Sequence, residues 1–196
     1  DDLSVLHTGS LAITPSQLPK IRKLFALMRD YGVIISMDIN IRLRASLNSR
    51  AYLDGVRSLL TLADIVKASD EDLEPFELAA NPREAAARAH EEMGQGMLSL
   101  SVGTGGARLH PATGVIEKGS YPVAKIEDTV GAGDTFLSAF LASLCRSNAI
   151  KGPYRDIDCD ILGDAVDFAC AAAAINVSRV GCSPPTQDEV ERFVQS

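Results

Sequence analysis

Short apolar runs alternate along the chain with longer segments in which apolar residues recur at every third or fourth position. Residues 33–37 (VIISM) are rich in Val and Ile, which is typical of a buried parallel strand. Between residues 18 and 28 the apolar side chains follow helical spacing. We expect this helix to begin at Thr14-Pro15 and to end at Gly32, because Thr and Pro favour helix starts and Gly favours helix ends.

The same patterns predict the remaining elements. Further strands are expected at residues 3–7, 64–68, 97–102, 107–110, 115–118 and 121–124. Further helices are expected at residues 50–62, 82–92, 162–178, from a glycine-rich turn at 128–134 to about 147, and from about 187 onward. Ser69 and Asp72 have capping-box spacing, and residues 111–114 fit the turn of a hairpin. Strands alternating with long helices indicate crossover connections, so we expect one α/β domain over residues 1–196 with a mostly parallel sheet.

Composition narrows the functional classes without naming one. The chain has 196 residues, of which 46% are hydrophobic and 23% charged, and its net charge is −7. This acidity counts against a nucleic-acid-binding domain, which usually presents a basic face. No apolar run approaches the roughly 18 residues of a membrane span, and the first residues lack the basic start of a signal peptide. We therefore expect a cytoplasmic protein with no membrane or nucleic-acid partner.

The four cysteines are Cys145, Cys159, Cys170 and Cys182. No pair is separated by two residues, and no His lies beside them at metal-ligand spacing. We expect four reduced thiols, with Cys170 buried in an alanine-rich helix.

Polar residues gather where the predicted strands end. These clusters are Thr8-Gly9, residues 38–42, residues 69–72, residues 103–106 and residues 128–134. In open α/β sheets, ligands bind outside the carboxyl ends of the strands. The common placement of the clusters therefore predicts one ligand site.

The sharpest cluster is DTVGAGD at residues 128–134. Gly131, Ala132 and Gly133 lie where a helix opens, so their N–H groups are expected to be free and to favour an anion. Asp134 in the first turn would repel a phosphate if it only bound one, but it suits a base that takes a proton from an attacking hydroxyl. The alternative is a well-capped helix in which Asp134 simply interacts with the dipole. The phosphate loop of the Walker type is absent.

These residues resemble a known family. DTVGAGD, continuing as TFLSAF, is similar to the C-terminal signature of ribokinase-like (PfkB) carbohydrate kinases. Residues 6–13 (LHTGSLAI) and 38–42 (DINIR) resemble the fructokinase and 2-keto-3-deoxygluconate kinase branch. Residues 67–73, 103–107 and 171–181 resemble, in order, the family's acidic segment, nucleotide-phosphate loop and adenine-side helix. The resemblance covers nearly the whole chain and implies a three-layer ribokinase-like fold.

The resemblance also implies roles for single residues. Asp134 matches the catalytic base, and the amides of Gly131, Ala132 and Gly133 match the anion hole. Positions matching the nucleotide site are Thr104, Gly106, Ala169, Cys170 and Ala173, with Cys170 replacing a common Asn or His. Asn40 and Arg42 match residues that face phosphate or substrate, although Arg42 can equally be a surface residue after a strand.

ATP and Mg²⁺ are the implied cofactors, and K⁺ is a candidate third. Asp128, Val130, Asn176 and Gly181 match a monovalent-cation site built partly of backbone carbonyls. Asp72 matches the acidic residue of the Mg²⁺ network, where Ser69-x-x-Asp72 departs from the more common Asn-x-x-Glu.

The family's N-terminal strands, Gly-Gly substrate motif and small β lid have no counterpart here, and the chain starts at Asp1. We therefore expect an incomplete chain, the C-terminal nucleotide-binding and catalytic part of a sugar kinase. Whether the whole protein forms a homodimer through the missing lid is a question that the sequence leaves undecided. The expected reaction is ATP-dependent phosphorylation of a hydroxyl of a small sugar, with fructose first. Alternatives are 2-keto-3-deoxygluconate, another sugar or a nucleoside as substrate, or a non-catalytic nucleotide-binding fragment.

Overall fold

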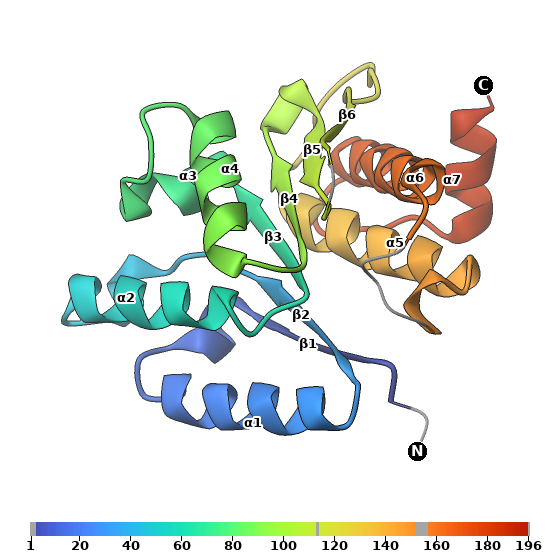
Figure 1. Ribbon diagram of the computed structural model, residues 1–196. Coiled ribbons are helices and arrows are strands. Elements are labelled where there is room, and N and C mark those ends of the chain that lie inside the picture. Colours follow the sequence, from blue (N-terminus) through green and yellow to red (C-terminus); the bar gives the residue numbers. More distant parts are fainter. Residues whose placement is uncertain (1–2, 113, 152–156, 196) are drawn as a thin grey trace. The chain divides into compact units, whose positions relative to one another are not determined.

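A computed structural model describes residues 3–112, 114–151 and 157–195, which form two compact units. Of the described residues, unit 1 comprises those up to residue 100 together with 110–112 and 114, and unit 2 comprises residues 101–109 and those from 115 onward. The chain is a mixed α/β protein, in which strands and helices alternate through the first four strands (Figure 1). Short 3₁₀ segments occur at Ser10–Ile13, Leu43–Ala45, Glu74–Phe76, Gly103–Gly105 and Ala149–Lys151.

Unit 1 is built on four strands that are neighbours in sequence order. They are β1 (Val5–Gly9), β2 (Ile34–Asp38), β3 (Ile65–Ser69) and β4 (Met97–Ser101). β1 pairs with β2 and β2 with β3 in parallel register, which places Gly9 opposite Asp38 and Asp38 opposite Lys67. All five residues of β2 are buried, as expected for a parallel strand covered on both faces.

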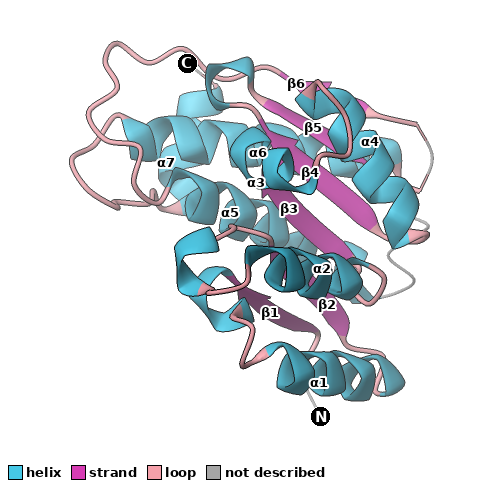
Figure 2. Ribbon diagram, turned by 90° about the vertical axis from the view of Figure 1, so that its left-hand side faces the viewer, coloured by secondary structure: helices cyan, strands magenta, loops and turns pink. Residues whose placement is uncertain are grey.

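Three helices make the crossovers between these strands. They are α1 (Leu18–Asp30), α2 (Ser49–Leu60) and α4 (Pro82–Met93), and Figure 2 shows them on one face of the strands. The predicted apolar stripe of α2 is confirmed, because Tyr52, Val56 and Leu59 are all buried. Side chains cap two of the helices: Asn48 Oδ1 accepts the Ala51 N–H at 3.0 Å, and Asn81 Oδ1 accepts the Glu84 N–H at 2.9 Å.

Unit 2 combines a hairpin with a helical layer. The hairpin strands β5 (Ala107–His110) and β6 (Ile116–Lys118) are antiparallel, as the sequence predicts, although Thr113 of its turn lies outside the described residues. Helices α5 (Ala132–Arg146) and α6 (Cys159–Val177) pack against each other, and α7 (Gln187–Val194) packs against α6. Val190 of α7 lies on the small side chains of Ala171 and Ala172, which let the two helices approach closely.

Two expected elements differ in the structure. α1 begins at Leu18 rather than at Thr14: the Thr14 carbonyl accepts the N–H groups of Gln17 and Leu18 in a preceding turn, and Pro19 has no N–H with which to continue these bonds into the helix. The strand expected at residues 121–124 does not form. Tyr121 instead packs its ring on Phe193 and donates its hydroxyl to Asp167 Oδ2 at 2.8 Å. An aromatic residue that favours strands is thus placed against helices, because the tertiary contacts outweigh its strand propensity.

Two other expectations concern the thiols and membranes. Cys170 is buried, whereas Cys145, Cys159 and Cys182 are exposed, and all four are free thiols. Over the described residues, no helix combines the length and the apolar character that crossing a bilayer requires.

Candidate functional site

The N-terminus of α5 presents the carboxylate singled out by the sequence. Asp134 is the third residue of the helix, its side chain is exposed, and it makes no hydrogen bond or ion pair within the described chain. The preceding Gly131 has φ of 76°, a left-handed value that favours glycine. A Cβ atom there would lie 2.3 Å from Cys182 Sγ, so a side chain at this position would have to displace Cys182. The chain thus turns sharply into α5 and leaves Asp134 open to solvent.

The amides at this turn are not all free, in contrast to the sequence prediction. Ala132 donates its N–H to the Thr129 carbonyl at 3.2 Å. The N–H groups of Gly131 and Gly133 have no acceptor among the described residues, as is usual for the first turn of a helix. Two amides beside a carboxylate therefore remain available to a ligand, with the positive end of the α5 dipole behind them.

The four residues expected to hold a monovalent cation come together beside this turn. The Asp128 carboxylate accepts the N–H of Val130 at 2.9 Å through Oδ1 and the N–H of Gly181 at 3.2 Å through Oδ2. Asn176 is wholly buried and donates its Nδ2 to the Val130 carbonyl at 2.9 Å. Residues 128–131 are therefore held by the last turn of α6 and by the segment that follows it.

The glycine-rich loop between β4 and β5 has a defined shape. Gly106 has φ of 86°, and a Cβ atom on it would lie 2.1 Å from the Lys118 carbonyl oxygen. Only glycine allows this approach of the loop to the residues after β6. Ser120 donates its hydroxyl to the Thr104 carbonyl at 2.6 Å, while the Thr104 side chain is exposed. Of the two residues predicted for the nucleotide phosphates, Thr104 is therefore exposed, whereas Gly106 is buried against the residues at the end of β6.

The α6 residues predicted for the adenine side differ in exposure. Ala169 is fully buried and Cys170 nearly so, which leaves only Ala173 with surface to offer a ligand. Burial, and next the charge of Asp167, raise the pKa of the Cys170 thiol to about 12. Burial also raises the pKa of Tyr121 to about 12, and its bond to Asp167 adds to that effect. Neither group is ionised near neutral pH, so this surface carries no thiolate or phenolate there.

Unit 1 places the other predicted residues around the end of β3. Asp72 Oδ1 accepts the Ile41 N–H at 2.8 Å, and Oδ2 accepts the Ser69 N–H at 2.8 Å and the Ser69 hydroxyl at 2.7 Å. The predicted capping box is confirmed and opens the short helix α3 (Asp70–Leu73). Asp72, expected in a Mg²⁺ network, is thus occupied in tying the residues after β2 to the end of β3.

Asn40 and Arg42 flank the residue that Asp72 holds. Asn40 has φ of 37°, a left-handed value that Asn tolerates better than most residues. The Arg42 guanidinium is exposed, and among the described residues it donates only to the neighbouring Ile41 carbonyl, at 3.3 Å. Arg42 therefore has donors to spare for an anionic ligand.

One arrangement escaped the sequence analysis. Lys67 Nζ lies 3.3 Å from Asp38 Oδ1, and their side chains are 6% and 5% exposed. The sequence does show a charged residue at the end of one apolar run, Asp38, and another inside a second run, Lys67. That these two residues are partners follows from the pairing of β2 with β3, which the sequence does not reveal.

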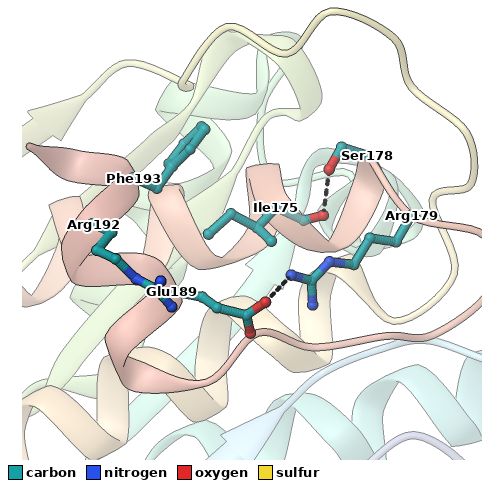
Figure 3. A pocket seen from close by; sticks show the side chains of 6 residues that line it. All are labelled: Ile175, Ser178, Arg179, Glu189, Arg192 and Phe193. Carbon is teal, nitrogen blue, oxygen red and sulfur yellow. Dashed lines mark hydrogen bonds and ion pairs between the residues drawn. The ribbon is translucent and has the colours of Figure 1, made fainter. Parts of the chain in front are cut away.

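We also searched the described residues for metal-binding clusters and for pockets near the residues predicted to bind ligands. The described residues contain no group of three or more His, Cys, Asp or Glu side chains that could hold a metal ion. An open pocket of about 470 Å³ in unit 2 is lined by Ile175, Ser178, Arg179, Glu189, Arg192 and Phe193 (Figure 3). None of the residues predicted to bind substrate or nucleotide lines it.

Solved structures share this fold. Aminoimidazole riboside kinase from Salmonella enterica, solved with aminoimidazole riboside and an ATP analogue, has a TM-score of 0.83 at 24% identity. The match covers 98% of this chain and 63% of that one. Fructokinase from Vibrio cholerae, solved with fructose, ADP and calcium, has a TM-score of 0.83 at 24% identity, over 96% of this chain and 60% of that one. The chain thus has the α/β fold of ribokinase-like proteins, of which it covers a part.

Sequence comparison defines the family. A model described as pfkB family carbohydrate kinase matches residues 2–189. A probable fructokinase-5 of Arabidopsis thaliana is 28% identical over 98% of this chain and 58% of its own length. A fructokinase of Rhizobium leguminosarum bv. trifolii is 31% identical over 76% of this chain and 45% of its own length. The chain belongs to the pfkB family of carbohydrate kinases, and it spans about half the length of these two curated relatives.

Proposed function

We propose that the protein carrying this chain transfers a phosphoryl group from ATP to a hydroxyl of a small sugar, with fructose as the first candidate. The observation that carries the proposal is the free carboxylate of Asp134 beside the two free amides of Gly131 and Gly133. A base and an anion site side by side are what attack of a hydroxyl on a phosphate requires. Fructokinase relatives at modest identity support the choice of fructose.

In the proposed reaction, Asp134 accepts the proton of the attacking sugar hydroxyl. The N–H groups of Gly131 and Gly133 donate to the phosphoryl oxygens as charge develops on them, and the α5 dipole adds to this stabilisation. Thr104 and Gly106 lie near the other phosphates, Ala173 near the adenine, and Arg42 with Asn40 binds substrate or phosphate oxygen.

Mg²⁺ fits this site as a partner of the nucleotide. Because the described chain has no carboxylate cluster that could hold a divalent ion, the phosphates of ATP would supply most ligands, as is usual for Mg²⁺. When bound, the ion neutralises phosphate charge. A cytoplasmic location and the domain assignment of residues 1–196 stay predictions.

The test is an assay of ATP consumption against a panel of fructose, 2-keto-3-deoxygluconate, ribose and aminoimidazole riboside. Asp134→Asn is expected to lower kcat by about 10²–10⁴-fold, the usual contribution of a general base. Asp160→Asn is the matched control, because Asp160 is also an exposed carboxylate in the first turn of a helix. The control should keep full activity.

The main alternative is a nucleotide-binding protein without catalysis. It would bind ATP in calorimetry while no sugar stimulates turnover, and Asp134→Asn would then leave ATP affinity unchanged. Full activity of Asp134→Asn with any sugar would contradict the proposed base.

A further inference from the structure

The turn before α5 is joined to the end of α6 and the segment after it by one side chain from each partner, Asp128 and Asn176. Asp128 accepts one backbone N–H from each segment, from Val130 and Gly181. Asn176 spans the same junction: Nδ2 donates to the Val130 carbonyl at 2.9 Å, and Oδ1 accepts the Ser183 N–H at 3.0 Å. We call these four hydrogen bonds the α5–α6 junction.

The oxygens of this junction face hydrogen-bond donors. A monovalent cation is coordinated by carbonyl oxygens, and it occupies the position where a hydrogen-bond donor would otherwise lie. Here the Val130 carbonyl points to the Asn176 NH₂ group, and each Asp128 carboxylate oxygen accepts an amide N–H. A cation among these atoms would face the partly positive hydrogens of Asn176. The residues therefore fit a cation poorly.

Asn176 cannot relieve the conflict by turning its amide over. The flip would offer Oδ1 to a cation, but it would set NH₂ against the Ser183 N–H, and two donors would then face each other. The side chain is wholly buried, so water cannot compensate for the lost bond.

The segment after α6 is also fixed from its outer side. Arg179 donates through Nη1 to the Ser183 carbonyl at 3.3 Å, and its Nη2 forms an ion pair with Glu189 of α7 (Figure 3). The bond to Arg179 and the bond to Asn176 thus hold the two sides of Ser183. Moving the segment after α6 away from the turn would strain both bonds.

We propose that the Asn176 side-chain amide takes the place of a monovalent cation in this chain. It supplies a hydrogen-bond donor to the Val130 carbonyl oxygen, and so it holds the start of α5 without K⁺. The structural part stands on these contacts alone, and the consequence for catalysis rests on the proposed function.

The first test is thermal unfolding of the wild-type 196-residue chain in KCl and in tetramethylammonium chloride at matched ionic strength. A ligand that binds only the folded state raises the melting temperature in a saturable way. We expect equal melting temperatures in the two salts. Saturable stabilisation by K⁺ but not by tetramethylammonium would overturn the proposal.

The second test replaces the amide by an oxygen ligand. Asn176→Asp removes the NH₂ donor and faces the Val130 carbonyl with a carboxylate, so we expect a melting temperature lower by roughly 5 °C or more in tetramethylammonium. K⁺ should recover part of that loss. Asn81→Asp is the control, because it makes the same charge change at a helix N-cap where Asp serves as well as Asn. An Asn176→Asp variant as stable as the wild type without K⁺ would contradict the proposal.

The two tests remain separate from the proposed kinase activity. If Asn176→Asp does not fold, the wild-type titration decides alone. Where turnover is detected, wild-type kcat should be the same in both salts. Where it is not, the proposed function fails but the melting temperatures still test the role of Asn176.

Discussion

Lys67 and Asp38 form an ion pair across neighbouring parallel strands, and both side chains are almost completely buried. Removing one partner of such a pair leaves the other charge in a medium of low polarity. Lys67→Met should therefore lower the free energy of unfolding by about 3–5 kcal/mol, measured by urea denaturation.

The double variant Asp38→Leu with Lys67→Met is the informative control. It removes both charges and keeps apolar volume, so its loss of stability should be smaller than that of Lys67→Met alone. A double variant that loses as much as the sum of both single variants would show that the two charges do not act as a pair.

Gly106→Ala tests the shape of the glycine-rich loop. The substitution adds a left-handed strain of about 1 kcal/mol and, in addition, a Cβ atom against the Lys118 backbone. Gly94→Ala also has a positive φ, 68°, with a different ψ of −33° against −141° at Gly106, and open space around it, so it measures the cost of a positive φ without a steric clash. We expect Gly106→Ala to cost clearly more in unfolding free energy than Gly94→Ala. Equal losses of unfolding free energy in the two variants would mean that the loop can move to accommodate the Cβ atom at no further cost.

The raised pKa of Tyr121 predicts that the free energy of unfolding falls at alkaline pH. Its pKa rises from the ordinary value of 10.0 to about 12, so the folded protein holds this proton more tightly than the unfolded chain. The contribution of Tyr121 to stability is fully present below pH 10 and is lost as pH rises towards about 12. Tyr121→Phe should flatten the fall of unfolding free energy over that range. Tyr31→Phe, at a 74% exposed residue, should not change it.

Asp72→Asn separates positioning from metal binding. Asn offers one acceptor oxygen where Asp72 uses two, so at least one bond to Ile41 or Ser69 is lost. The expected cost is about 1–3 kcal/mol in unfolding free energy. In the proposed kinase assay the Mg²⁺ concentration at half-maximal rate should stay unchanged. A several-fold rise in that concentration, with unfolding unaffected, would instead place Asp72 among the metal-facing residues.

Local patterns predicted the elements that depend on local forces. The spacing of apolar residues found α2, and the Ser69–Asp72 spacing found the capping box, because both are set within a few residues. The strand expected at residues 121–124 was wrong, since strand formation needs a partner and Tyr121 packs against helices instead. The start of α1 was misplaced because Pro19, which has no N–H, separates the turn at Thr14 from the helix.

The site shows the same division. Asp134 and the glycines of its turn could be recognised, because a helix start has a local signature. The bond from Asn176 to the Val130 carbonyl joins residues 46 positions apart, and no spacing rule reveals it. The occupied amide of Ala132 and the buried Ala169 likewise follow from packing that only the folded chain defines.

The contact between Gly131 and Cys182 has a consequence for how this chain can be divided. The sequence DTVGAGD ends at Asp134, yet the backbone of its turn is bounded by Asn176, Gly181 and Cys182. A shorter piece that ends before these residues would keep every letter of the motif and lose the atoms that shape it. The structural unit around Asp134 therefore extends at least to Ser183, and its turn is built from two segments that are far apart in the sequence.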